Sequence, residues 1–157
     1  RRRRGGADVA SRGRLRAGEI LVLGRTARGE RLTRGLARDA WEIRSRGRLV
    51  WADALHLDGD LARAIADPAG LAGAVAYATF VYAADDAAER IELARGLLPA
   101  NDEGVLRSGA TIVNGVLVVR WLAREAFALR AAFTAFWVAF RCRVGGGAGG
   151  LPRLWSI

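Results

Sequence analysis

The amino-acid sequence predicts a mainly β domain with layered strands and two α-helices, and three observations support this class. Asn114-Gly115 separates two β-rich runs, at 107–113 and 116–122, and both residues tolerate the positive φ of a type I′ hairpin turn. Both faces of the alternating run 49–57 are largely apolar, which predicts a strand covered on both sides. Apolar residues at three- and four-residue steps predict a long helix over about 123–142.

The N-terminal third is expected to begin with a basic, flexible segment. Residues 1–16 are rich in arginine and glycine and hold few apolar side chains, so we expect the ordered part to be a single domain over 17–157. A buried strand is predicted at 20–23, and two strands are predicted within 39–57, joined near residues 45–47. A helical turn over 61–66 ends at Asp67-Pro68, because a residue before proline disfavours the α conformation.

The second half alternates strands and helices. The run 73–83 predicts a long strand, and Asp85-Asp86 then precedes a helix over about 87–98 that ends at Pro99. The two aspartates are expected to supply an N-cap and favourable charge at the positive end of this helix. A glycine run at 145–150 links the long helix to the end of the chain. The apolar stripe of the long helix consists of Leu122, Ala126, Leu129, Phe133, Phe136 and Phe140.

Composition and charge narrow the class of protein. The 157 residues, 52% of them hydrophobic, suffice for a core, and all 25 basic residues are arginine. Residues 1–50 hold 15 arginines and 5 acids (+10), residues 51–103 hold 3 and 10 (−7), and residues 104–157 hold 7 and 1 (+6). This dipolar pattern favours charged partner surfaces.

Three features predict a cytoplasmic protein without membrane association. They are the single cysteine, the lack of a signal-peptide pattern, and the ten-residue length of the most apolar run, 131–140.

Residues with catalytic or metal-binding chemistry are few. His56 is the only histidine and Cys142 the only cysteine, and with no paired spacing both are expected to be packed side chains. The acidic patch that includes Asp85, Asp86 and Glu89 is expected to be a solvated helix N-terminus. Every Ser-His-Asp or Cys-His set depends on the one histidine, so we expect neither an enzyme nor a small-molecule substrate. An arginine-rich nucleic-acid-binding module is the alternative function, although no aromatic RNA-binding motif accompanies the basic tail.

The segment after the first buried strand contains two glycines, Gly24 and Gly29, which bracket four residues. Glu30 follows the second glycine. Glycines so close to a strand end indicate a sharp turn or a close approach of another chain. The spacing fits neither a phosphate-binding loop nor a dinucleotide-binding fingerprint. Two arrangements of Arg25 and Glu30 are open. In one they hold the loop closed, and in the other Glu30 faces a partner while Arg25 orients it.

This segment resembles the GRxAxGE signature of the urease accessory protein UreD family. The resemblance runs from about residue 16 to residue 155, and five motifs occurring in the family order make it specific. The resembling stretches are Gly24-Arg25-Thr26-Ala27-Arg28-Gly29-Glu30, Gly47-Arg48-Leu49-Val50-Trp51-Ala52-Asp53, Val118-Val119-Arg120, Leu129-Arg130 and Leu151-Pro152-Arg153-Leu154-Trp155.

The resemblance implies a layered, partly helical-wound β-sheet that carries two helices. Members of this family are about twice as long, so the chain is similar to their C-terminal half. The resemblance further implies a non-enzymatic scaffold that binds apo-urease with UreF and UreG and assists the transfer of nickel, which passes through without being held tightly. The residues it marks for partner contact or the nickel path are Gly24, Arg25, Gly29, Glu30, Arg120, Pro152, Arg153 and Trp155.

Overall fold

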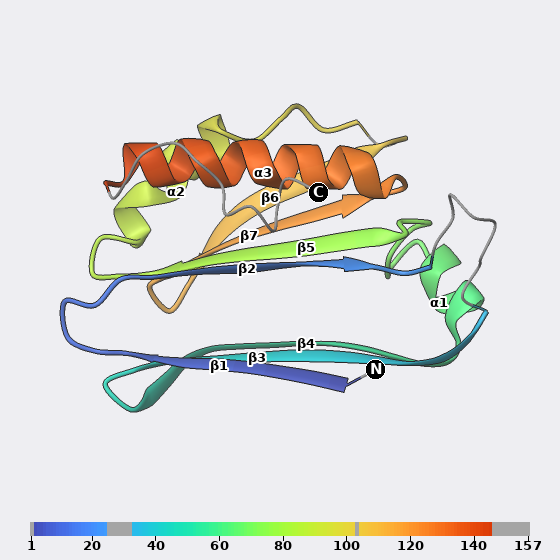
Figure 1. The fold of residues 1–157 in the computed structure, drawn as a ribbon, viewed down its shortest axis with the longest axis horizontal. Helices are drawn as coiled ribbons and strands as arrows, with labels where there is room; N and C mark the ends of the chain where they lie inside the picture. The colour runs from blue at the N-terminus through green and yellow to red at the C-terminus, as the bar shows by residue number, and fades with distance from the viewer. Residues whose placement is uncertain (1, 25–32, 103, 146–157) are drawn as a thin grey trace.

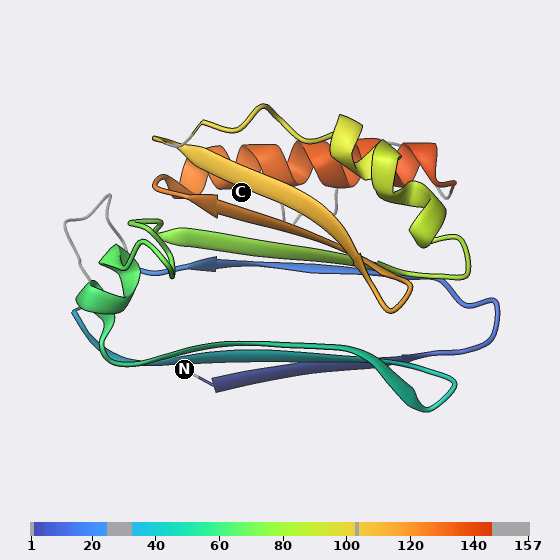
Figure 2. The same cartoon turned by 180° about the vertical axis from the view of Figure 1, so that it is seen from behind.

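The computed structural model describes residues 2–24, 33–102 and 104–145, which form three layers (Figures 1 and 2). A three-stranded sheet of order β1-β3-β4 faces a four-stranded sheet of order β2-β5-β7-β6, and the helices α2 and α3 cover the other face of the four-stranded sheet. The mainly β, layered class is thereby confirmed. The elements are β1 (Arg2–Val9), β2 (Leu15–Val22), β3 (Arg34–Ser45), β4 (Arg48–Asp60), α1 (Leu61–Ala66), β5 (Ala76–Ala83), the 3₁₀ turn η2 (Ala88–Arg90), α2 (Ile91–Gly96), β6 (Leu106–Val113), β7 (Val116–Ala123) and α3 (Ala126–Arg143).

The first three strands wind between the two sheets. The chain leaves the three-stranded sheet after β1, forms the edge strand β2 of the facing sheet and returns to the first sheet as β3. As a result, β1 and β3 are parallel neighbours. The expectation of a flexible segment over 1–16 is therefore wrong for the described part, which forms β1 and begins β2. The stabilisation comes from partners distant in sequence: β1 pairs along its length with β3, Val9 is buried, and Arg4 forms a 2.5 Å ion pair with Glu42.

Two hairpins follow the sequence prediction. Arg46 and Gly47, with φ of 54° and 76°, connect β3 to β4, while Asn114 and Gly115, with φ of 47° and 79°, connect β6 to β7. The prediction that both faces of the second strand are covered is wrong. One face of β4 contacts the other sheet, whereas the opposite face is exposed because the three-stranded sheet is an outer layer among the described residues.

The helices lie where the sequence predicts them, but their first and last residues differ from the prediction. The helical turn at 61–66 is α1, whose first turn is capped by Asp60 accepting a hydrogen bond from the Arg63 amide at 3.0 Å. The helix expected over 87–98 is split into η2 and α2, and neither Asp85 nor Asp86 caps it. The long helix begins at Ala126 because the preceding residues continue β7. None of the helices in the described ranges is both long and apolar enough to cross a membrane.

The main hydrophobic core lies between α3 and the four-stranded sheet. The predicted stripe residues Phe133, Phe136 and Phe140 are at most 1% exposed. Phe80 of β5 meets the rings of Phe136 and Phe140 edge-on at centroid distances of 5.1 and 5.2 Å, and Trp121 of β7 meets Phe136 in the same way at 5.1 Å. These contacts fix α3 across β5 and β7.

Gly18 of β2 permits this close approach of helix and sheet. A Cβ atom at this position would lie 2.7 Å from Cζ of Phe133 and 3.0 Å from the carbonyl oxygen of Thr79. We therefore expect Gly18→Ala to lower the free energy of unfolding by about 1–3 kcal/mol through overpacking. Urea denaturation measures the change, with Gly109→Ala as control, because a Cβ there meets no atom within 4 Å. Equal effects of the two substitutions would contradict this account.

Candidate functional site: a polar cluster between the sheets

Polar side chains occupy the centre of the space between the two sheets. Glu19, Thr79 and Arg120 are neighbours in register across β2, β5 and β7, and they alternate with residues that face α3. In the facing sheet, Trp41 of β3 is in register with Asp53 of β4. We call this set the interlayer polar cluster. It consists of Glu19, Asp39, Trp41, Asp53, Tyr77, Thr79 and Arg120.

Asp53 connects the two sheets through hydrogen bonds. Its Oδ2 atom accepts from Nη2 of Arg120 at 2.6 Å and from the Tyr77 hydroxyl at 3.4 Å, and the Tyr77 oxygen in turn accepts from Oγ1 of Thr79 at 2.8 Å. The Arg120 and Asp53 side chains are 47% and 27% exposed, so this end of the cluster reaches solvent. Burial raises the pKa of Tyr77 above its ordinary value, which keeps its hydroxyl a donor at neutral pH.

Two further carboxylates lie deeper. Glu19 is 6% exposed and accepts a hydrogen bond from the indole Nε1 of Trp41. Asp39 is 8% exposed, and its Oδ1 atom has no hydrogen-bond donor among the residues that the structure describes. A buried carboxylate oxygen without a donor is costly, so it contributes little as a structural stabiliser. This combination of burial and incomplete pairing marks Asp39 as a candidate functional residue.

The interlayer polar cluster separates two apolar clusters of the same space. One contains Val9, Ile43 and Trp51, and the other contains Leu57 and Leu61. The carboxylates of the cluster come from three different strands, and no group of three or more His, Cys, Asp or Glu side chains within the described ranges is arranged to hold a metal ion. The arrangement offers carboxylate oxygens singly, the kind of ligand that a hydrated divalent cation exchanges with water.

Of the residues marked by the sequence, Arg120 belongs to the interlayer polar cluster. Gly24 follows β2 and has a φ of 98°, which fits the sharp turn predicted there. The remaining marked residues lie outside the described residues. They are Arg25, Gly29, Glu30, Pro152, Arg153 and Trp155.

Sequence analysis did not identify the other members of the cluster as site residues. The available signal was a charged residue at an inward position of an apolar strand: Asp53 shares the predicted face of Trp51 and Leu55, and Glu19 immediately precedes the apolar run 20–23. Period-two alternation shows that such a residue is inward-facing. It does not show which strand of the other sheet lies opposite.

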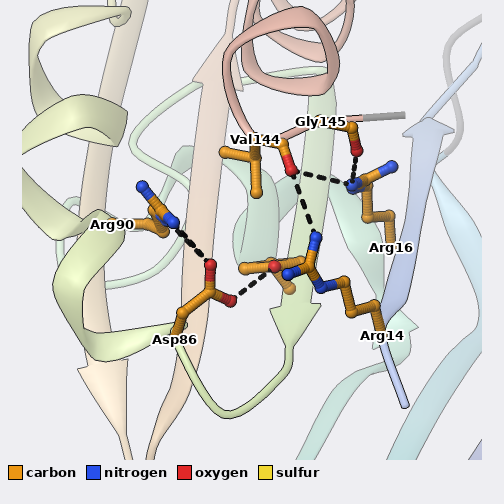
Figure 3. Close-up of polar contacts among 7 residues, drawn as sticks. Arg14, Arg16, Asp86, Arg90, Val144 and Gly145 are labelled. Carbon is orange, nitrogen blue, oxygen red and sulfur yellow. Dashed lines mark hydrogen bonds and ion pairs between the residues drawn. The ribbon is translucent and has the colours of Figure 1, made fainter. Parts of the chain in front are cut away.

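A second polar cluster lies beside the end of α3, where it joins β5 to η2 and β2 to the residues that follow α3 (Figure 3). Oδ1 of Asp86 accepts from the Tyr82 hydroxyl at 2.7 Å, and Oδ2 accepts from Nε and Nη2 of Arg90 at 3.0 and 2.7 Å. Close by, Nη2 of Arg16 donates to the Gly145 carbonyl at 2.6 Å, beyond the C-terminus of α3. The expectation that Asp86 belongs to a solvated acidic patch is therefore wrong, because Asp86 joins β5 to η2.

The protonation states of Tyr82 and Asp86 in this second cluster are those of a structural contact. Burial and the hydrogen bond to Asp86 raise the pKa of Tyr82 to about 12. Burial alone would raise the pKa of Asp86, but the hydrogen bonds from Tyr82 and Arg90 outweigh it and hold that pKa below its ordinary value. The network therefore has its stabilising form, with neutral Tyr82 and ionised Asp86, across the neutral range.

This network predicts a loss of stability at high pH. Because the Tyr82 pKa is about 12 in the folded chain against an ordinary value of 10.0, its contribution is complete below pH 10 and disappears as the pH rises toward 12. We expect the urea midpoint to fall through this window in the unaltered chain and to fall less in Tyr82→Phe. Equal pH dependence in both chains would show that Tyr82 is not the responsible group.

His56 and Cys142 do not form a joint site. His56 is exposed on β4 in the three-stranded sheet, whereas Cys142 is exposed near the end of α3, on the far side of the four-stranded sheet. The expectation that both are packed side chains is wrong. His56 lies on the uncovered face of the outer sheet, and Cys142 lies outside the buried stripe of α3.

Comparison with known proteins agrees with the motif order in the sequence. The family model described as UreD urease accessory protein matches residues 2–156. A urease accessory protein UreD of Magnetococcus marinus is 45% identical over 146 residues, covering 92% of this chain and 50% of the relative. One of Methylobacterium sp. is 44% identical over 152 residues, covering 96% and 52%. The chain thus spans about half the length of these relatives, and it belongs to the UreD urease accessory protein family.

Proposed function

We propose that the chain is part of a cytoplasmic urease-maturation scaffold that binds apo-urease together with UreF and UreG and assists nickel delivery to the urease active site. The observation that carries this proposal is the family match over residues 2–156. The relatives are named as accessory proteins, which supports a non-enzymatic role.

The interlayer polar cluster supports a role in nickel transfer. An ion in transit must be released again, so a path for it requires oxygen ligands that bind weakly and one after another. The carboxylates of Glu19, Asp39 and Asp53 meet this requirement, because they lie between the sheets on separate strands. In this proposal Arg120 neutralises Asp53 at the exposed end and lowers the affinity for a cation there.

The charge distribution supports docking to several partners. Opposite charges accumulate in different segments, +10 over residues 1–50 (15 arginines, 5 acids) and −7 over residues 51–103 (3 arginines, 10 acids). Segments of opposite sign steer the encounter with partners of complementary charge. This arrangement fits a scaffold that holds more than one protein.

The experiment expresses a UreD protein that contains these residues with a urease operon from which the native UreD gene has been removed. We expect UreF to copurify with it and urease activity to be restored, and a chain with Asp53→Ala and Arg120→Ala is expected to retain UreF while restoring less activity. Retention on nucleic acid at moderate salt without UreF binding would instead favour the nucleic-acid-binding alternative.

A further inference from the structure

A pocket of about 240 Å³ opens at one end of the space between the two sheets. Among the described residues, four connections rim it: the turn between β1 and β2, the β3–β4 hairpin, the segment after β5 and the β6–β7 hairpin. Figure 1 shows these connections together at the left end of the molecule. The described residues that line the pocket include no member of the interlayer polar cluster, so this is a separate place in the fold.

The pocket has an apolar floor and a polar rim. Its floor includes Val9, Ala83 and Val116, which belong to an apolar cluster between the sheets and are at most 9% exposed. Arg46 and Asp85 are the only charged side chains among the described residues that line it. An apolar base with a few polar groups at its edge is typical of small-molecule sites, and the volume suits a ligand smaller than a drug.

The two charges lie on opposite walls and do not pair with each other. Arg46 lies in the hairpin of the three-stranded sheet, whereas Asp85 follows β5 of the four-stranded sheet. Both residues are exposed, and within the described ranges neither forms an ion pair. Because facing sheets pack about 10 Å apart, a molecule that bridges the walls can supply each charge with the counter-charge it lacks.

The turn at Arg46 is unusual for an arginine. Its φ of 54° lies in the left-handed region, which asparagine and glycine adopt more readily. The β6–β7 hairpin has Asn114 at the equivalent position of its turn, with a φ of 47°. Among the described residues, the Arg46 guanidinium donates a hydrogen bond to Oγ of Ser11 at 3.4 Å, which is too long to offset much of this cost. Contacts within the described chain therefore do not account for an arginine here.

A ligand with a carboxylate at one end and an ammonium at the other fits this pocket. The carboxylate can accept from Arg46 and Ser11, and the ammonium can donate to Asp85. Nδ2 of Asn114 donates to the Val50 carbonyl at 3.0 Å, so its amide oxygen is a further acceptor on the rim. Given the spacing of facing sheets, a stem of about five methylene groups has the length to bridge the walls across the apolar floor.

We propose that this pocket binds an ω-amino acid group, a carboxylate and an ammonium joined by a short aliphatic stem. A free ω-amino acid and the C-terminal lysine of a polypeptide share this chemistry. The binding does not depend on the nickel role.

The test measures binding of 6-aminohexanoate by calorimetry to a UreD protein that contains these residues. We expect saturable binding with a dissociation constant on the order of 0.1–1 mM, because two charge-assisted contacts and a small apolar area are available. Hexanoate lacks the ammonium and hexylammonium lacks the carboxylate. Each is expected to bind about tenfold or more weakly.

Arg46→Asn separates the role of the side chain from that of the turn. It removes the guanidinium and introduces a residue that accepts positive φ, so we expect the melting temperature to rise by a few degrees while 6-aminohexanoate binding weakens about tenfold or more. Arg12→Asn is the matched control, because Arg12 is exposed, has a φ of 60° and does not line the pocket. It removes the same charge and is expected to bind 6-aminohexanoate normally. Asp85→Asn is expected to weaken 6-aminohexanoate and to leave hexanoate binding unchanged.

Nα-acetyl-lysine distinguishes the two sources, since its amide stands in for the chain before a C-terminal lysine. Binding as tight as that of 6-aminohexanoate or tighter assigns the site to a polypeptide end, and weaker binding assigns it to a free small molecule. The proposal is overturned if 6-aminohexanoate shows no saturable binding at millimolar concentration. It is also overturned if Arg46→Asn and Arg12→Asn bind it equally, or if hexanoate or hexylammonium binds as tightly as 6-aminohexanoate.

Discussion

Replacement of Phe136 by alanine is expected to lower the free energy of unfolding by about 3–5 kcal/mol. Its ring is 1% exposed and lies at the centre of the aromatic contacts between helix and sheet, 5.1 Å from the rings of both Phe80 and Trp121 and 5.5 Å from Phe140. The neighbouring rings of Phe80, Trp121 and Phe140 belong to three different elements, so they cannot fill the cavity without moving α3. Urea denaturation followed by tryptophan fluorescence measures the loss.

The same helix provides the control. Phe127 is 83% exposed, so Phe127→Ala removes little buried area and is expected to change the free energy of unfolding by less than about 0.5 kcal/mol. Comparable losses in the two variants would mean that α3 does not pack through the stripe containing Phe136, and the three-layer description would have to be abandoned.

Replacement of Asp39 by leucine is expected to have the opposite sign and to raise the free energy of unfolding by about 1–2 kcal/mol. Asp39 is 8% exposed and lies opposite Leu55 in register, on the face that meets the other sheet. One of its carboxylate oxygens has no donor among the described residues. Leucine removes this desolvation cost and adds apolar contact. A stability gain on losing a polar residue is characteristic of positions kept for function.

Asp58 is the matched control for this prediction. It is an exposed aspartate of the same sheet, on β4, so Asp58→Leu gains no buried contact and is expected to leave stability nearly unchanged. Thermal melting of the three chains makes the comparison. If Asp39→Leu melts well below the unaltered chain, Asp39 is a structural residue and cannot be assigned to a nickel path.

Elements with a strong local signal were predictable from the sequence. Asn114-Gly115 determines its hairpin because both residues adopt positive φ, and the helical turn at 61–66 has an aspartate cap before it and Asp67-Pro68 after it. The stripe of α3 was predictable because helical periodicity alone fixes which side chains share a face. In each case the determining residues lie within a few positions of one another.

Features that depend on distant partners were not predictable. The arginine-rich β1 extends only because β3 pairs with it in parallel, 36 residues away in register. The exposed face of β4 depends on which sheet forms the outer layer. The helix after Asp86 begins differently from the prediction because that side chain binds Tyr82 and Arg90, and a local capping rule does not include either partner.

The candidate site shows the same division. Arg120 was identified through a motif, but its pairing with Asp53 joins residues 67 positions apart. Glu19 and Asp39 stand out only after the two sheets are stacked, because burial of a carboxylate follows from what covers it. Sequence analysis located one member of the interlayer polar cluster, and the packing of the sheets supplied the others.

The most direct measurement of the central proposal, that carboxylates between the sheets carry nickel to urease, is the nickel content of urease matured in cells whose UreD protein contains Asp39→Asn. This substitution removes one negative charge while keeping the shape of the side chain. With Asp58→Asn as control, we expect nickel per urease active site to fall by about tenfold or more for Asp39→Asn alone, while both UreD variants accumulate and bind UreF normally. Full nickel content with Asp39→Asn would contradict the proposal.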